Sequence, residues 1–358
     1  MKSNENPKIF VAGAKGLVGS SIVKKLSEKG YTNLLTPTHS ELDLRRQKET
    51  EEFFAKERPE YVFLAAAKVG GIYANNTYRA DFIYDNLAIA INIIHSAYKF
   101  NVKKLLNLGS SCIYPKYAPQ PLKEEYLLSG ELEPTNEPYA IAKIAAIKLC
   151  QSFNFQHKTN FISLMPTNLY GEKDNFNLET SHVLPALIRK FLLAKALSEN
   201  NFDFLVRDAQ KHKLGFGLDS EIQIEEVKTI IDALGKIGIT SKYVTLWGQG
   251  KALREFLYVD DLADACIYFM ENFDAKDTEP FLNIGTGEDI SIRQLAELVK
   301  SIVGFEGDIQ WDPSKPEGTP RKLLDISRAK ALGWSPRTSL DEGIKKVVEY
   351  YIKNIQHI

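Results

Sequence analysis

The sequence predicts an α/β fold in which a doubly wound parallel sheet is joined by a smaller mixed α/β domain. Short apolar runs of strand length alternate with helix-length segments through the first 170 residues, as is typical of a parallel sheet. The runs are almost continuously apolar, which is expected of strands buried on both faces. A glycine-rich turn directly follows the first run, and its place between a strand and a helix supports the same fold class.

The expected elements follow in order along the chain. Strands are predicted at 9–12, 33–37, 61–67, 104–110 and 161–166, and helices at 46–57, 80–100 and 137–157. We place a first domain at 1–170, with a returning segment at about 242–285. A second, substrate-binding domain is expected at 171–241 and 286–358, and it includes an insertion at about 198–241.

The composition favours a small-molecule ligand. The 45 Lys and Arg residues nearly balance the 46 Asp and Glu residues, so we expect no nucleic acid and no membrane as a partner. No apolar stretch approaches the ~20 residues of a spanning helix, and residues 1–10 lack the apolar part of a signal peptide, so a cytoplasmic location is expected. Cys112, Cys150 and Cys266 lie far apart without C-x-x-C spacing, which argues against disulfides and against a metal site.

The glycine turn predicts a dinucleotide site. Gly13, Gly16 and Gly19 form a G-x-x-G-x-x-G pattern, and Leu17 opens the helix behind it. Glycines let the backbone approach a pyrophosphate, and free N–H groups at the helix N-terminus attract the anion. The first domain is therefore expected to be Rossmann-like, with a glycine-rich turn that binds no ligand as the alternative.

The end of the second strand favours NADP(H) as the cofactor. Folds of this class that bind NAD usually end this strand with an acidic residue that binds the ribose 2′-hydroxyl. Here residues 36–44 read TPTHSELDL, with no carboxylate before Glu41. Lys15 and His39 are the candidate cations for a 2′-phosphate, although each has the alternative of an ordinary surface residue.

Ser110, Cys112, Tyr139 and Lys143 are the candidate catalytic residues. The segment NLGSSCIYP, 107–115, follows the fourth strand, and the carboxyl ends of parallel strands line the ligand crevice. Tyr139 and Lys143 share one face of a helix because they are four residues apart. We expect the Lys143 ammonium to lower the pKa of the Tyr139 phenol from its usual value of about 10. Tyr139 would then donate a proton to a carbonyl oxygen as hydride arrives, while Ser110 donates a hydrogen bond and Lys143 also holds the nicotinamide ribose.

Several segments spread over nearly the whole chain carry a more specific signal. They are AGAKGLVGS, LAAAKVGGIYANNTYRADFIYDN, LGSSCIYPK, LEPTNEPYAIAKIAAIKLC, MPTNLYGEKDNF, SHVLPALIRKF, REFLYVDDLADA, NIGTG and SKPEGTPRKLLD. Together they resemble the extended short-chain dehydrogenase/reductases, and within them the GDP-L-fucose synthase family. What this resemblance implies is an NADPH-dependent 3,5-epimerase/4-reductase that acts on GDP-4-keto-6-deoxy-mannose.

The resemblance implies roles for further residues. Cys112 and His182 are implied as the base and the acid of epimerisation. The residues implied to hold the GDP-sugar are Asn168, Lys190, Trp247, Arg254 and Arg321. A C4 ketone acidifies the protons at C3 and C5, so a base on one face and a proton donor on the other can invert both centres. A guanidinium fork suits diphosphate oxygens, and a structural ion pair is the alternative for each of the two arginines. A homodimer is also expected.

Two features depart from the family pattern. The family usually carries arginines near the glycine turn and after the second strand, where this chain has Lys15, Pro37 and His39. The second feature is the insertion of about 40 residues, which is long enough to be a functional element. Within it, residues 221–239 predict an amphipathic helix. Its apolar residues are Ile224, Val227, Ile230, Ile231 and Leu234, and its stop signals are Gly235 and Gly238.

The apolar stripe of this helix requires a cover. The candidates are the outer face of the substrate domain, a neighbouring subunit and the mouth of the sugar pocket. Because the insertion joins two segments implied to contact the GDP-sugar, we expect it to act as a lid or wall that changes which sugar is accepted. Packing on its own domain without a functional role is the alternative.

Other functions stay open at this point. A C4 reductase of a related GDP-sugar such as a 6-deoxy-heptose, with or without epimerisation, fits the same fold. A 4,6-dehydratase is disfavoured, because such enzymes carry an acidic pair where this chain has Ser111 and Cys112. A non-catalytic, redox-sensing NADP-binding regulator would need the glycine turn but not the pair Tyr139 and Lys143.

Overall fold

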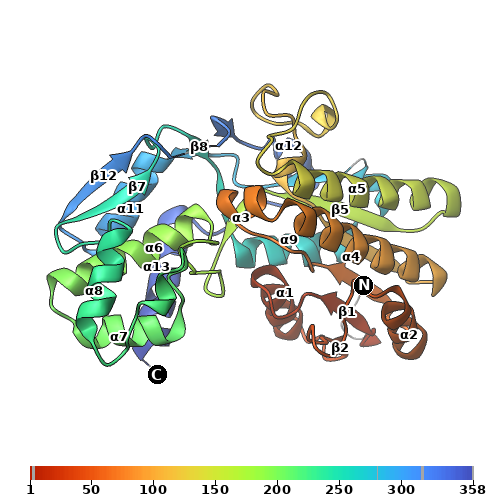
Figure 1. Ribbon diagram of the computed structural model, residues 1–358. Helices are drawn as coiled ribbons and strands as arrows, with labels where there is room; N and C mark the ends of the chain where they lie inside the picture. The colour runs from red at the N-terminus through yellow and green to blue at the C-terminus, as the bar shows by residue number, and fades with distance from the viewer. Residues whose placement is uncertain (2–4, 280, 316–317, 357–358) are drawn as a thin grey trace.

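Six parallel strands form the central sheet of the molecule, on the right of Figure 1. The computed structural model describes residues 1, 5–279, 281–315 and 318–356. Residues 2–4 of the N-terminal segment and residues 316–317 of the segment SKPEGTPRKLLD therefore lie outside the described residues. The strands are β1 Ile9–Ala12, β2 Leu34–Leu35, β3 Tyr61–Leu64, β4 Lys104–Leu108, β5 Phe161–Pro166 and β10 Leu282–Ile284. The five predicted strands and the parallel α/β fold are confirmed, although β2, β3 and β4 are shorter than predicted.

The order of the strands creates a binding crevice. Across the sheet the order is β10-β5-β4-β3-β1-β2, so the chain runs outward from β1 to β2 and returns to β3 on the other side of β1. Ligands of open α/β sheets bind outside the carboxyl ends of the strands where the order reverses in this way. The glycine turn that follows β1 stands at this crevice.

Helices cover both faces of the sheet because successive strand residues point to opposite sides. In β1, Ile9 and Val11 belong to the apolar cluster of α1 and α9, whereas Phe10 and Ala12 belong to that of α2, α4 and α5. The helices are α1 Leu17–Glu28, α9 Val259–Asn272, α2 Gln47–Glu57, α4 Arg79–Lys99 and α5 Glu137–His157. The three predicted helices are confirmed to within one residue. We call the sheet and these helices the sheet lobe.

A second group of elements, on the left of Figure 1, packs around helix α6 and shares one apolar cluster. It contains α6 Val183–Ser198, α7 Phe202–Lys211, α8 Val227–Lys236, α11 Ile292–Val303, α13 Leu340–Gln356, β7 Tyr243–Trp247 and β12 Asp308–Asp312. Strands β7 and β12 pair in parallel. We call this group the helical lobe. Within the described residues, no helix is both long and apolar enough to cross a membrane.

Short elements link the lobes. The paired strands are β6 Asn168–Tyr170 with β9 Phe256–Tyr258, and β8 Leu253–Arg254 with β11 Ile290–Ser291 and β13 Arg321–Lys322. The short helical turns are α3 Ile72–Thr77, α10 Ala275–Thr278, α12 Ser327–Ala331, η2 Ser111–Ile113, η3 Glu124–Tyr126 and η4 Leu218–Ser220. The chain rejoins the sheet lobe at β9 and α9 and not at residue 242, because β7 pairs within the helical lobe.

The stretch predicted as an insertion folds onto the helical lobe. Helix α7 was not predicted, and α8 begins at Val227, after Ile224. Gly235 lies inside α8, where an added side chain would meet open space, so it does not stop the helix. Gly238, with φ of +73°, ends the turn after the helix. Ile230 and Leu234 are buried in the cluster of the helical lobe, which is therefore the cover of the apolar stripe.

A buried ion pair anchors the first part of this stretch to helix α6. Arg189 of α6 donates to Asp208 Oδ1 of α7 at 2.6 Å, and neither side chain reaches solvent. The guanidinium also donates to the carbonyl oxygens of Phe176, His212 and Lys213. Tyr351 donates to the same Asp208 carboxylate. A buried charge requires such pairing and hydrogen bonding, so residues 212–213 are held firmly against α6.

Candidate active site

A cavity of about 1190 Å³ lies between the two lobes, at the carboxyl ends of the sheet strands. Residues from both lobes line it. Those among the predicted site residues are Gly16, Leu17, Gly19, Ser110, Cys112, Tyr139, Lys143, Asn168, His182, Lys190, Trp247 and Arg254. Gly13, Lys15, His39 and Arg321 do not line it. The structure thus brings most of the predicted residues to one cavity.

Close packing shapes the glycine turn. A Cβ added to Gly19 would lie 2.1 Å from the Gly13 carbonyl oxygen, and one added to Gly13 would lie 2.8 Å from the Ala66 backbone. No larger residue fits at either position. Helix α1, which begins behind Gly16, has no side-chain cap and no acidic residue in its first turn. Its N–H groups are therefore available to an anion such as a pyrophosphate.

The end of β2 carries charges of both signs. Lys15 and His39 are exposed, and His39 Nδ1 lies 3.9 Å from Asp43 Oδ1. Glu41 folds back onto Thr38, whose N–H donates to Glu41 Oε2 at 2.7 Å. The hydrogen bonds from Thr38, followed by the nearby charge of Lys15, lower the pKa of Glu41. The two predicted cations therefore share this edge with two carboxylates.

Ser110, Tyr139 and Lys143 meet around the end of β4. Lys143 Nζ donates to the Leu108 carbonyl oxygen at 2.8 Å and lies 5.7 Å from the centroid of the Tyr139 ring. Burial lowers the pKa of Lys143 to about 8. Burial, and then the neighbouring Cys112, raise the pKa of Tyr139, against the lowering effect of its hydrogen bond with Ser110.

The expectation that Lys143 lowers the pKa of Tyr139 is therefore wrong in this structure. The two side chains do lie one helical turn apart, but the ammonium bonds a backbone carbonyl, and burial of the phenol dominates. A phenol with a raised pKa is protonated at neutral pH. Tyr139 thus already holds the proton that a general acid must donate.

The Cys112 thiol has two polar neighbours that were not singled out from the sequence. Lys322 Nζ lies 3.3 Å and Asn136 Nδ2 lies 3.4 Å from Cys112 Sγ. Burial by itself would raise the pKa of the thiol, but Lys322, Ser110 and Arg254 outweigh it, so the pKa is lowered. A thiolate is the form that acts as a base or nucleophile, and a nearby cation favours it.

Arg321 and Lys322 are neighbours on β13, so their side chains point to opposite sides. Lys322 lines the cavity, whereas Arg321 Nε donates to Asp289 Oδ2 at 2.6 Å in an exposed ion pair. Arg321 does not line this cavity, where a contact with GDP was expected of it. Strand alternation was the available signal, because it sends the side chains of adjacent strand residues in opposite directions.

His182 stands directly before α6 and is open to the cavity, although protein surrounds it. Burial, and then the charge of Lys322, lower the pKa of its imidazole. Lys322 therefore acts on two groups. Its positive charge favours the thiolate of Cys112 and opposes the imidazolium of His182.

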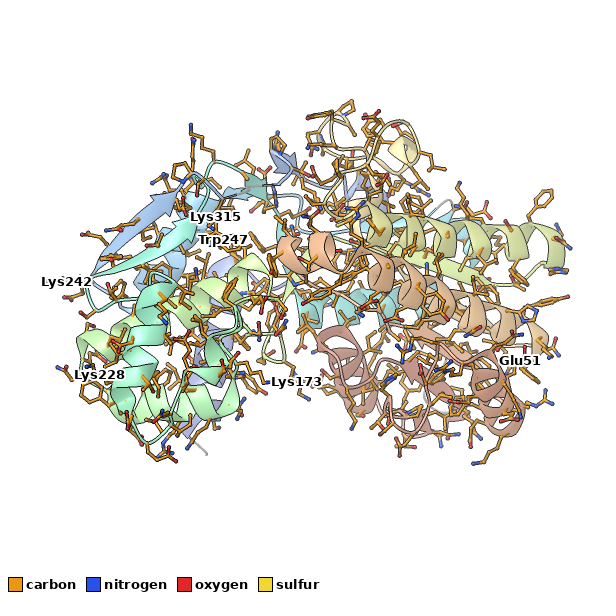
Figure 2. All side chains as sticks on the ribbon, in the orientation of Figure 1. Glu51, Lys173, Lys228, Lys242, Trp247 and Lys315 are labelled. Carbon is orange, nitrogen blue, oxygen red and sulfur yellow. The ribbon has the colours of Figure 1, made fainter. Side chains whose placement is uncertain are left out.

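The remaining predicted side chains of the cavity lie on or beside the helical lobe. Asn168, Lys190 and Arg254 donate to the carbonyl oxygens of Glu255, Thr245 and Leu253 at 2.7, 3.2 and 2.8 Å. Burial lowers the pKa of Lys190 to about 8. Trp247 ends β7 with 38% of its surface exposed, and Lys315 Nζ lies 5.7 Å from its ring. Figure 2 shows Trp247 and Lys315 together in the part of the helical lobe nearer the sheet lobe.

Asp174 is a further polar group of the cavity that the sequence did not reveal. Its Oδ2 atom is buried and has no hydrogen-bond partner among the described residues, and burial raises its pKa to about 7. A lone aspartate in a polar loop gives no sequence signal of burial. Among the described residues, no group of three His, Cys, Asp or Glu side chains is arranged to hold a metal ion.

Comparison with known proteins finds relatives over nearly the whole chain. Residues 9–208 and 225–285 match the model of the NAD dependent epimerase/dehydratase family. GDP-L-fucose synthase 1 of Arabidopsis thaliana is 52% identical over 99% of this chain and 95% of its own. GDP-L-fucose synthase of Escherichia coli strain K12 is 46% identical over 97% of each chain. The structure of a GDP-mannoheptose C4 reductase from Campylobacter jejuni with NADP bound is 44% identical, with a TM-score of 0.85 over 98% of this chain and 99% of that one.

The family-model match is interrupted within the predicted insertion. Residues 209–224 are unmatched, and they lie inside the predicted 198–241. The unmatched stretch begins in the last turn of α7 and ends before α8.

Proposed function

Because the chain belongs to the NAD dependent epimerase/dehydratase family, we propose that it converts GDP-4-keto-6-deoxy-D-mannose to GDP-L-fucose, with NADPH as reductant. One observation carries this proposal. A thiol with a lowered pKa, Cys112, lines the same cavity as Ser110, Tyr139 and Lys143. Reduction of a ketone needs only the latter three, whereas a base beside them also permits inversion at C3 and C5.

The cofactor site accepts NADP(H) at the glycine turn. Gly16, Leu17 and Gly19 line the cavity at a helix N-terminus without acidic residues, which fits the pyrophosphate. Lys143 is assigned to the nicotinamide ribose. Lys15 and His39 are the groups assigned to the 2′-phosphate. When bound, the cofactor supplies the hydride for C4.

Cys112 and His182 carry out the epimerisation. The Cys112 thiolate removes the proton at C3, and the electron pair of that C–H bond moves into an enolate that includes the C4 oxygen. The His182 imidazolium returns a proton to the opposite face, and repetition at C5 inverts the second centre. Each inversion leaves a thiol and a neutral imidazole, which exchange protons with water before the next one.

Tyr139 and Ser110 complete the reduction. Tyr139 is protonated at neutral pH because its pKa is raised by burial. It donates this proton to the C4 oxygen as hydride reaches C4, and Ser110 donates a hydrogen bond to the same oxygen. Ser110 also accepts a hydrogen bond from the Cys112 N–H at 3.2 Å, which holds its hydroxyl beside the thiol.

The nucleotide part of the substrate is assigned to the helical-lobe side of the cavity. Lys190 and Arg254 offer positive charge for the diphosphate, and Arg254 can bind its oxygens bidentately. Trp247 presents an exposed aromatic face, and Asn168 presents an amide beside them. Arg321 is left out of this set because it is paired with Asp289 outside the cavity.

Incubation with NADPH and GDP-4-keto-6-deoxy-D-mannose in deuterated water tests the proposal. We expect one NADPH to be consumed per GDP-L-fucose formed, with deuterium at C3 and C5 of the product. Absence of both NADPH consumption and deuterium would refute the enzyme assignment and leave a non-catalytic NADP-binding regulator.

A C4 reductase of a related GDP-sugar is the second candidate. The solved GDP-mannoheptose C4 reductase matches this chain nearly end to end, which favours it. The same experiment separates the two candidates, because a reductase without epimerisation consumes NADPH and leaves C3 and C5 free of deuterium. The cation-bound Cys112 thiol is the reason we place it second.

We further infer a cytoplasmic homodimer. Helices α4 and α5 pack side by side and expose the apolar side chains Tyr84, Ile91, Ile141 and Phe155. Exposed apolar side chains on two neighbouring helices suit a second copy of the chain. Cys112, Cys150 and Cys266 are free thiols, as in a reducing compartment. Sedimentation equilibrium and cell fractionation test the two assignments, and a monomer at micromolar concentration would contradict the first.

A further inference from the structure

The loop that the family model skips, 209–224, enters the cavity between the lobes. Phe216 and Leu218 of this loop line the cavity, together with predicted site residues such as His182 and Trp247. The loop is tied down at its start, because the carbonyl oxygens of His212 and Lys213 accept hydrogen bonds from the buried Arg189. It is therefore a built part of the cavity lining.

Phe216 is held in a backbone conformation that residues other than glycine rarely adopt. Its φ is +55°, between Gly215 at +83° and Gly217 at +74°. Its N–H donates to Glu179 Oε2 at 2.9 Å, and Asp219 accepts from the Leu214 and Gly215 N–H groups at 2.8 and 3.0 Å. Strained backbone of this kind persists only where the surroundings enforce it, and it gathers at ligand sites.

The Phe216 ring lies close to two other aromatic rings of the cavity. Its centroid lies 6.3 Å from that of Tyr73, on α3 of the N-terminal half, and 6.3 Å from that of Trp247, on β7 of the helical lobe. We call Tyr73, Phe216 and Trp247 the aromatic wall. All three line the cavity, so the wall is part of its lining.

Backbone contacts tie Phe216 and Tyr73 to the loop that carries His182. Glu179, which accepts from the Phe216 N–H, lies three residues before His182. The segment that leads to Tyr73 touches the same loop, because the Gly71 N–H donates to the Thr180 carbonyl oxygen at 3.0 Å. Phe216 and Tyr73 are thus both fixed to the loop that presents the residue proposed to protonate C3 and C5.

We propose that Phe216 is a specificity-determining residue that packs against the C5 substituent of the sugar and favours a methyl group over a longer, hydroxylated one. This proposal rests on the proposed function. An aromatic ring gives a methyl group apolar contact but offers a hydroxyl group no hydrogen-bond partner. An added hydroxymethyl group would therefore lose its hydration against the ring without compensation.

Substrate preference of Phe216→Ala tests the proposal. The preference is the ratio of kcat/KM for GDP-4-keto-6-deoxy-mannose to that for its 6-deoxy-heptose homologue. We expect the ratio to fall by about tenfold or more in the variant, the scale of discrimination that a hydrophobic pocket provides. Phe216→Gly is the second variant, because glycine accepts the left-handed backbone and keeps the loop unstrained.

Phe202→Ala is the matched control, since Phe202 opens α7 and does not line the cavity. The affinity for GDP, measured by calorimetry, should stay the same in all variants. An unchanged substrate ratio in folded Phe216→Ala and Phe216→Gly would overturn the proposal. So would a loss of GDP affinity equal to the loss in kcat/KM, which would assign the ring to the nucleotide. Wild-type protein that turns over neither substrate would instead refute the proposed function itself.

Discussion

Cys112 and Tyr139 line the same cavity and are both enclosed by protein, yet their pKa values move in opposite directions. Burial raises the pKa of the phenol, and Lys143 Nζ, 5.7 Å from the ring centroid, bonds a carbonyl oxygen instead of countering this shift. Burial would raise the pKa of the thiol as well, but Lys322 stands 3.3 Å from its sulfur and reverses the shift. The difference shows that burial sets the direction of the pKa shift unless an opposite charge comes within hydrogen-bonding distance.

Removal of the thiol should have the largest effect on this contrast. In Cys112→Ala we expect proton exchange at C3 and C5 to fall below detection, because no other base is assigned to those carbons, while reduction of a C4 ketone continues. Deuterium incorporation measured by mass spectrometry checks both parts. Cys150→Ala is the control, since burial raises the pKa of that thiol to about 12 and it does not line the cavity. Exchange at the wild-type rate in Cys112→Ala would show that another group is the base.

Removal of the Tyr139 hydroxyl should affect reduction, the other half of the comparison. We expect Tyr139→Phe to lower the rate of reduction by about 10²–10⁴-fold, the usual contribution of a general acid, and to leave NADPH affinity nearly intact. Single-turnover NADPH oxidation and a binding titration measure the two quantities. Deuterium exchange should persist in this variant. Wild-type reduction would mean that the Tyr139 proton has no part in the reaction.

Lys322→Met should shift the pH dependence of epimerisation. In the proposed epimerisation the exchange rate follows the product of the Cys112 thiolate and His182 imidazolium fractions, so the two pKa values set the two limbs of a bell-shaped pH profile. Because Lys322 lowers both pKa values, its removal should move both limbs to higher pH. Each unit by which the Cys112 pKa rises costs about tenfold in thiolate below that pKa.

The pH profile of deuterium exchange measures this shift, and Lys322→Arg should retain most of the wild-type profile because it keeps the charge. Reduction by the Tyr139 route should keep its own pH dependence in both variants. A profile that stays in place in Lys322→Met would show that the cation does not control the thiol.

The smallest effect concerns the cofactor. We expect NADPH to bind more tightly than NADH, and Lys15→Ala to shrink that difference by several-fold, because an exposed charge-assisted contact to the 2′-phosphate is lost. Glu41→Gln sharpens the test, since it removes a carboxylate close to Lys15 and should raise NADPH affinity. Dissociation constants for both cofactors decide the matter. Equal wild-type constants would mean that the missing acidic residue at the end of β2 does not set the preference.

The parts of the molecule that the sequence predicted are those specified by neighbouring residues. Strand β5 is a continuous apolar run, and Tyr139 and Lys143 share a helix face, so spacing alone places them. Lys322 is 210 residues from Cys112 in the chain, and only the folded arrangement of both lobes brings them together. The raised pKa of Tyr139 was missed for a similar reason, because the burial of a side chain depends on elements far away in sequence.

The contact between Lys322 and Cys112 makes the Cys112 thiol more sensitive to oxidation. A cavity-lining thiol with a lowered pKa reacts more readily with peroxide and electrophiles than an ordinary thiol, and its first oxidation product is a sulfenic acid that a reducing thiol can reverse. Cys150 and Cys266, buried and with raised pKa values, are far less reactive. Oxidation of Cys112 would thus stop the proposed inversion of the sugar before it disturbed the fold, and a bound substrate would protect the Cys112 sulfur.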